Sequence, residues 1–162
     1  MRRALRWFFF VVGALSLAAG ITGYVARWTG GPIGPISGGA LRGTFTASPL
    51  PDPATLARRR EVQLQVNPAA PRSVNVWVLV VDGIVYVPSS LPEWKIWPAV
   101  LANDPHAVLR VDSSLYDVSA HRVEDPALVA RLRQALERKY GTTGGDGWFF
   151  RLDVGNGGAA AP

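Results

Sequence analysis

The feature that most constrains this chain is a run of twenty residues without a charge near its start. Residues 7–26 read WFFFVVGALSLAAGITGYVA. At a rise of about 1.5 Å per residue, a helix of this length spans roughly 30 Å, which is the thickness of one hydrocarbon core. The sequence therefore predicts a membrane-spanning signal-anchor helix over residues 7–26.

The charges beside this run predict its orientation. The segment 1–6 carries three arginines and the amino terminus, whereas Arg27 is the single charge directly after the run. Basic residues are retained on the cytoplasmic side. We therefore expect a single-pass protein of the inner (cytoplasmic) membrane, with the N terminus inside and the folded domain outside the cytoplasm. Tyr24 and Trp28 fit an interfacial aromatic belt.

The same residues allow a second interpretation, a cleaved signal peptide. A short basic segment, an apolar stretch and Ser16-Leu17-Ala18 resemble a cleavage site. The apolar run continues past that site to Ala26, and its length suits a span better than a signal peptide. In both cases the rest of the chain crosses the membrane.

The net charge of +5 does not indicate a nucleic-acid partner. Four of the seventeen basic residues flank the apolar run, so the other thirteen face twelve acidic residues and the remaining net charge is +1. A nearly neutral domain lacks the basic surface that binds a polyanion. The chain also contains no cysteine, which excludes disulfides, thiolate nucleophiles and cysteine-bound metals.

Composition divides the rest of the chain into three parts. Residues 27–40 are rich in glycine and proline and are expected to form a tether or an ordered loop. Residues 41–154 carry the alternating patterns of a folded domain, and residues 155–162 are expected to be a disordered tail.

Alternation in the domain predicts about seven strands and two helices. The clearest strand, 73–81, has valines at 74, 76, 78 and 80 on the face that should meet the core, and Asp82-Gly83 predicts a hairpin after it. We expect a mainly β (α+β) fold, a small barrel. The other expected strands are 41–47, 61–66, 84–87, 106–112, 115–123 and 148–154, with a turn at Ser113-Ser114, and the helices are 95–103 and 126–139.

Motifs for catalysis or metal binding are missing from the sequence. The two histidines, His106 and His121, lie on predicted strands without carboxylates at metal-ligand spacing. Phosphate-binding loops and nucleophile elbows are also absent. We therefore expect no metal and assign no catalytic residue. Trp77, Trp94 and Trp97 flank the one loop that suggests a binding site.

That loop lies in residues 72–111, which read RSVNVWVLVVDGIVYVPSSLPEWKIWPAVLANDPHAVLRV. This stretch resembles the central segment of the split β-barrel flavin-binding superfamily, which includes pyridoxamine 5′-phosphate oxidases and deazaflavin-dependent nitroreductases. The resemblance consists of a strand after an arginine, an Asp-Gly hairpin, a strand ending in hydroxyl residues, a short helix ending before proline, and a valine-rich strand. It extends over about residues 41–154 and implies a split β-barrel.

The resemblance also implies a cofactor, FMN or deazaflavin, and a site for it. Arg72, Ser89, Ser90 and Lys95 would contact the phosphate or ribityl chain, Asn75 and Trp77 would line the ring, and Trp97 lies at the same loop. Such proteins are usually homodimers, and small residues at 14/18 and 19/23 could let two anchor helices pair. The expected function is a membrane-anchored oxidoreductase that reduces a small quinone- or nitro-type acceptor. The alternative is a non-enzymatic barrel that binds haem, another ligand or an envelope partner.

Overall fold

The computed structural model describes residues 2–28, 30–46 and 50–155. The tail expected over 155–162 lies outside these ranges except for Gly155, whose N–H donates to the Asp117 carbonyl at 2.9 Å. The helices are α1 (Arg2–Trp28), α2 (Pro53–Ala57), α3 (Ile96–Asn103), α4 (Pro126–Tyr140) and the 3-10 turn η1 (Pro92–Trp94). The strands are β1 (Thr44–Phe45), β2 (Glu61–Val66), β3 (Arg72–Trp77), β4 (Leu79–Val81), β5 (Ile84–Ser89), β6 (His106–Val111), β7 (Ser114–Arg122) and β8 (Trp148–Val154).

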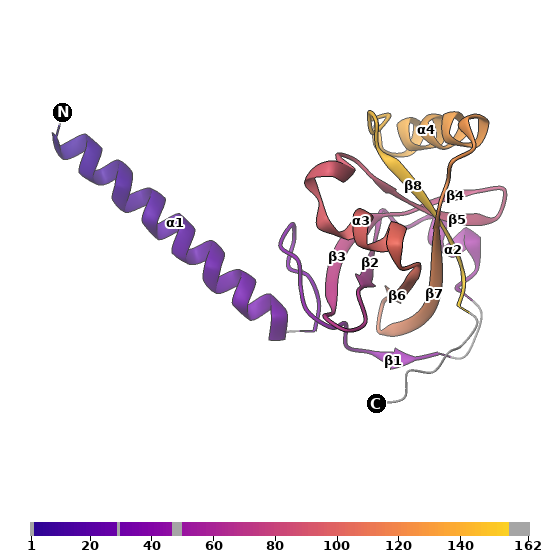
Figure 1. The fold of residues 1–162 in the computed structure, drawn as a ribbon, viewed down its shortest axis with the longest axis horizontal. Coiled ribbons are helices and arrows are strands. Elements are labelled where there is room, and N and C mark those ends of the chain that lie inside the picture. Colours follow the sequence, from indigo (N-terminus) through magenta and orange to yellow (C-terminus); the bar gives the residue numbers. More distant parts are fainter. Residues whose placement is uncertain (1, 29, 47–49, 156–162) are drawn as a thin grey trace.

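These strands form one curled, eight-stranded sheet. Its order is β3-β2-β6-β7-β8-β5-β4, with every neighbouring pair antiparallel, while the short β1 adds to β7 in parallel. Helix α1 projects away from this barrel, and α4 lies across one end of it (Figure 1). The predicted α+β barrel preceded by an apolar helix is confirmed.

The predicted strand 73–81 is divided at Val78, which explains why there are eight strands and not seven. The part before Val78, β3, pairs with β2, whereas the part after it, β4, pairs with β5 at the opposite end of the sheet order. One continuous stretch of chain therefore joins the two edges of the sheet. The Tyr140 hydroxyl accepts from the buried Val78 N–H at 3.1 Å and donates to the Arg60 carbonyl at 2.6 Å, while the Lys139 Nζ donates to the Val78 carbonyl at 2.7 Å.

The two faces of this stretch meet two different cores. Val76 and Val78 are buried in the main core inside the barrel, with Val74 and Val80 against it. The other face, which includes Leu79, packs under α4 with Leu132, Leu136 and Phe149. The predicted valine face is confirmed, and the opposite face is covered because α4 supplies a second apolar surface.

The predicted turns and helices are largely confirmed. Asp82 and Gly83 both have positive φ, 53° and 76°, as a tight hairpin turn requires. The second hairpin turns at Asp112-Ser113, one residue before the predicted Ser113-Ser114, and Asp112 has φ 57°. Asp125 caps α4 by accepting from the Ala127 N–H at 2.9 Å, and Gly141 ends it.

Of the strand predicted over 41–47, the structure describes residues 41–46, and within these only Thr44 and Phe45 form the strand; residue 47 lies outside the described ranges. The backbone before Thr44 is bound by side chains instead of a neighbouring strand. Gln65 Oε1 accepts from the Leu41 N–H at 2.7 Å, and the Arg110 guanidinium donates to the carbonyl of residue 42 at 3.0 Å. The short helices α2 and η1 were not predicted, because each is only one turn long.

The loop after α1 is tied to both the helix and the barrel. Ile33 and Ile36 pair with each other, and Gly38 exchanges backbone hydrogen bonds with Ser73 at the start of β3. A side chain at Gly38 would collide with the backbone of Gly31, so only glycine fits there. The end of α1 is therefore held close to the barrel.

Within the described ranges, one helix is long and apolar enough to cross a membrane. The candidate span is Leu5–Ala26, 22 residues within α1 and not buried against the rest of the chain. It covers the run predicted from the sequence, 7–26. Length and composition are thus compatible with an anchor.

Candidate functional site

The site lies in a hollow of about 160 Å³ where β3, β5, the start of α3 and the end of α4 meet. Six of the seven residues predicted from the sequence line this hollow: Asn75, Trp77, Ser89, Ser90, Lys95 and Trp97. These residues are separated by up to 22 positions in the chain. The Asp82-Gly83 hairpin brings them together because it folds β5 back beside β4, the continuation of β3.

Ser89 is the most unusual residue of the hollow. Its side chain is only 1% exposed, and its Oγ has no hydrogen-bond partner among the described residues. A buried hydroxyl is usually hydrogen-bonded, because leaving it unpaired costs free energy. This unpaired hydroxyl at the wall of a hollow indicates that a ligand can supply the missing hydrogen-bond partner.

Lys95 places a cation beside the hydroxyl of Ser90, in the same hollow that Ser89 lines. The Lys95 Nζ lies 3.3 Å from the Ser90 Oγ, and burial lowers the pKa of Lys95. An ammonium and two hydroxyls that line one hollow are donors of the kind that suit a phosphate. This corner therefore carries donors of the kind that an anion site requires.

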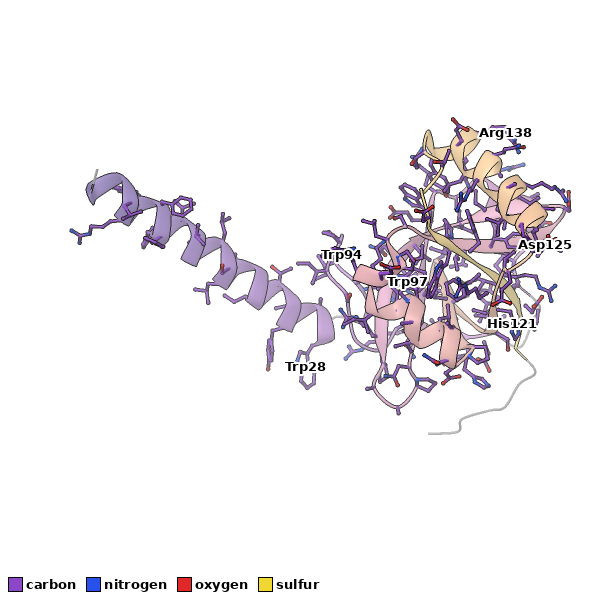
Figure 2. The ribbon with its side chains drawn as sticks, turned by 45° about the horizontal axis from the view of Figure 1, so that its top comes forward. Trp28, Trp94, Trp97, His121, Asp125 and Arg138 are labelled. Atoms are coloured by element: carbon purple, nitrogen blue, oxygen red, sulfur yellow. The ribbon has the colours of Figure 1, made fainter. Side chains whose placement is uncertain are left out.

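The aromatic residues form the opposite wall. The Trp77 ring stacks on Tyr140, with centroids 4.5 Å apart and planes 6° apart. Trp97 is almost fully buried and packs on Phe150 at 5.8 Å, so it belongs to the barrel core as well as to the hollow (Figure 2). A flat, rigid indole wall of this kind suits a planar ligand.

Arg72 does not line this hollow within the chain. It begins β3, three residues before Asn75 and on the opposite side of the alternating strand, and a strand separates such residues by roughly 10 Å. It lines a second hollow together with Gly23, Pro71 and Ile96. The predicted contact of Arg72 with a cofactor stays a prediction.

Residues that the sequence analysis did not select also line the site. They are Glu61, Val76, Pro88, Leu136, Gly144, Gly147, Trp148 and Phe149. A side chain at Gly147 would lie 2.6 Å from the Ser89 carbonyl, so the glycine-rich loop after α4 can close over Ser89 only with glycine there. The run Gly144-Gly145-Asp146-Gly147 was the available signal, but only the fold shows what it packs against.

Glu61 gives the hollow a negative end. It pairs across the sheet with Trp77. A carboxylate repels a phosphate, whereas the ammonium of Lys95 attracts one. Of the charged groups that line the hollow, Lys95 would therefore favour an anion and Glu61 would disfavour one.

The two histidines lie outside this hollow. His106 contacts Asp104, with the Nδ1 and Oδ1 atoms 2.7 Å apart, and this hydrogen bond lowers the pKa of the Asp104 carboxyl. Across residues 2–28, 30–46 and 50–155, no three side chains of the metal-binding types gather in one place.

Comparison with known proteins shows similarity at the level of the fold. No protein-family model matches the chain, and no curated protein matches it. A putative pyridoxamine 5′-phosphate oxidase from Listeria innocua superposes with a TM-score of 0.51 and 17% identity, over 62% of this chain and 88% of that one. HutZ, the heme storage protein from Vibrio cholerae, also gives 0.51 and 17%, over 64% and 87%.

A FAD-binding protein from Mesorhizobium loti gives a TM-score of 0.48 and 14% identity, over 62% of this chain and 83% of that one. The first two superpositions show that the chain shares the fold of these two proteins, a split β-barrel. The resemblance seen in residues 72–111 is thereby confirmed for the fold.

Proposed function

We propose that the chain binds a flavin or deazaflavin cofactor through its phosphate and transfers hydride from it to a small acceptor. The observation that carries this proposal is the unpaired, buried Oγ of Ser89 beside Ser90 and Lys95, at the edge of a hollow with an indole wall. On this fold, such a donor set fits the phosphate end of the cofactor.

The size of the hollow indicates that one chain holds only part of the cofactor. Pockets that enclose a small molecule usually measure about 300–1,000 Å³, whereas this one measures about 160 Å³. A second copy of the chain would supply the remaining wall, as the resemblance to dimeric family members implies. In such a homodimer, Arg72 of one copy could still face the cofactor of the other.

Different residues of the hollow would bind the two ends of the cofactor. Ser89, Ser90 and Lys95 would hold the phosphate, and Asn75 and Trp77 would lie along the ring. A bound flavin or deazaflavin supplies the hydride chemistry itself, so the protein needs to provide only binding, orientation and exclusion of water. The acceptor would be a small quinone- or nitro-type molecule.

The proposal includes the membrane. Helix α1 would anchor the chain in the cytoplasmic membrane by a single pass, and the arginines before it favour a barrel on the extracytoplasmic side. An acceptor that partitions into the bilayer would then be concentrated near the barrel.

The visible spectrum of the protein purified in detergent tests the proposal. We expect flavin or deazaflavin absorption, either co-purified or gained on adding the cofactor, and its loss in Lys95→Ala. Arg138→Ala is the matched control, because it also removes one positive charge but lies on the exposed face of α4 (Figure 2). A colourless protein that takes up neither cofactor would contradict the proposal.

Haem is the second candidate, because HutZ superposes as well as the oxidase does. A Soret band in the same spectrum, lost on replacing His106 or His121, would favour it. His106 is the better placed of the two, since Asp104 orients its ring through Nδ1 and leaves Nε2 free. Absence of any bound chromophore would favour a non-enzymatic envelope interaction protein.

A further inference from the structure

The segment between β5 and α3 exposes three large apolar side chains within six residues. Trp94 is 85% exposed, Leu91 65% and Ile96 59%. The buried Pro92 and Trp97 fix this segment to the barrel, so the three side chains are held outward. Other exposed apolar residues of the barrel, such as Ile84, stand singly in the sequence. Single exposed apolar residues are normal on a protein surface, whereas a cluster of them marks an interaction site.

The backbone of this segment is also unusual. Leu91 has φ 51° and ψ 56°, in the left-handed region that bulky side chains rarely adopt. Its backbone carbonyl accepts from the Trp94 N–H at 3.1 Å, which closes the turn. The protein thus maintains an unfavourable conformation that keeps an apolar side chain in solvent.

This segment lies beside the end of the candidate membrane span. Ile96 and Gly23 line the same hollow, of about 370 Å³, and Gly23 belongs to the span Leu5–Ala26. Gly23 is three residues from the end of that span, so at 1.5 Å per residue it lies about 5 Å inside the boundary. Figure 2 shows Trp94 on the side of the barrel that faces α1.

We propose that Leu91, Trp94 and Ile96 form a second membrane contact, which rests in the interfacial layer of the bilayer that α1 crosses. Tryptophan is enriched at this level because its ring is apolar and its N–H is polar. Tyr24 and Trp28 lie at the same level on α1, with ring centroids 6.4 Å apart. The barrel is thereby fixed in orientation as well as tethered.

The charges of this surface suit an apolar contact with lipid. Glu93 and Lys95 are the charged residues between positions 91 and 96, and they cancel. Arg72 is the charged residue of the hollow that Gly23 and Ile96 share, and it lies where lipid phosphates are found. The contact should therefore depend little on salt.

The contact has a consequence for the candidate site, and this consequence rests on the proposed function. Lys95 lies between Trp94 and Ile96 and also lines the cofactor hollow. The hollow is thus held at the level of the lipid headgroups. Its acceptor would be a lipophilic molecule that reaches the hollow from the bilayer.

Spin labels on the full chain test the contact without any cofactor. The chain has no cysteine, so Leu15→Cys, Ile84→Cys, Trp94→Cys and Ile96→Cys each accept one nitroxide. The labelled chains are placed in vesicles of phosphatidylcholine and phosphatidylglycerol. Relaxation by oxygen, which concentrates in the bilayer, is then compared with relaxation by a nickel complex that stays in water.

We expect the ratio of oxygen to nickel accessibility at 94 and 96 to be severalfold higher than at 84, which lies on the far β4–β5 hairpin (Figure 1). An equally low ratio at 84, 94 and 96, with a high ratio at 15, would overturn the contact but leave the anchor. A low ratio at 15 as well would overturn both and leave the cofactor test unaffected. Because Trp94 and Ile96 are exposed, unchanged circular dichroism should confirm that the labelled chains fold.

Discussion

Replacing Ser89 with alanine should change stability and ligand affinity in opposite directions. The Ser89 Oγ is buried without a partner, and such a group costs about 1–3 kcal/mol. Removing it should raise the free energy of unfolding of the ligand-free protein by about 1 kcal/mol. For a domain of this size, that corresponds to a rise in Tm of about 4 °C.

The same substitution should weaken the binding of FMN. A hydrogen bond to a charged group contributes about 1.5–3 kcal/mol, and each 1.4 kcal/mol is a factor of ten in the dissociation constant. Ser89→Ala should therefore bind FMN about 10- to 100-fold more weakly. Fluorescence titration measures the affinity, and thermal unfolding of the ligand-free protein measures the stability.

Ser73→Ala is the matched control within the same chain. Ser73 is also fully buried on β3, and its Oγ also has no partner among the described residues. It does not line the hollow, so its replacement should stabilise the protein but leave FMN affinity unchanged. Equal effects of the two substitutions on affinity, or none from either, would refute the reasoning.

Three further predictions concern the hollow and its supports. Because burial lowers the pKa of Lys95, FMN affinity should fall as the pH rises through that lowered pKa, where the neutral amine no longer attracts phosphate. Calorimetric titration should show no such fall in Lys95→Arg, and the same fall in both proteins would contradict the role of Lys95. Tyr140→Phe should cost about 1–2 kcal/mol in urea unfolding, since the Val78 N–H and the Arg60 carbonyl both lose their hydroxyl partner. Tyr116→Phe is the control, because in the described part of the chain its hydroxyl makes no hydrogen bond, and equal losses would argue against the Tyr140 contact. Asp125→Ala should cost about 1 kcal/mol in the same assay through loss of the α4 cap, and Glu124→Ala much less; a neutral Asp125→Ala would exclude the cap as a source of stability.

Much of the fold could be read from local patterns. The alternating valines identified the 73–81 stretch and its core face, and Asp82-Gly83 identified the hairpin that assembles the hollow. Asp125 and Gly141 gave the ends of α4 to within a residue. Six of the seven selected site residues line one hollow because they lie on elements that this hairpin folds together.

Other features of the fold and the site could not be read in this way. The break at Val78 depends on the Tyr140 hydroxyl, 62 positions away. The proximity of Gly147 to Ser89 depends on which strands become neighbours. A repeating sequence pattern indicates which face of a helix or strand is apolar, but it does not indicate which other element that face packs against.

The sequence by itself determined the apolar run, the strands, the tight turn and the capped helix, since these depend on side chains within a few positions of each other. Only the tertiary structure decided that the Ser89 hydroxyl is buried without a partner among the described residues, that Lys95 lines the same hollow, and that Trp94 is exposed near the end of α1. Burial, hydrogen-bond partners and the pKa of a lysine are set by groups distant in the chain. Those groups become neighbours only when the sheet curls and its two edges are joined through Val78.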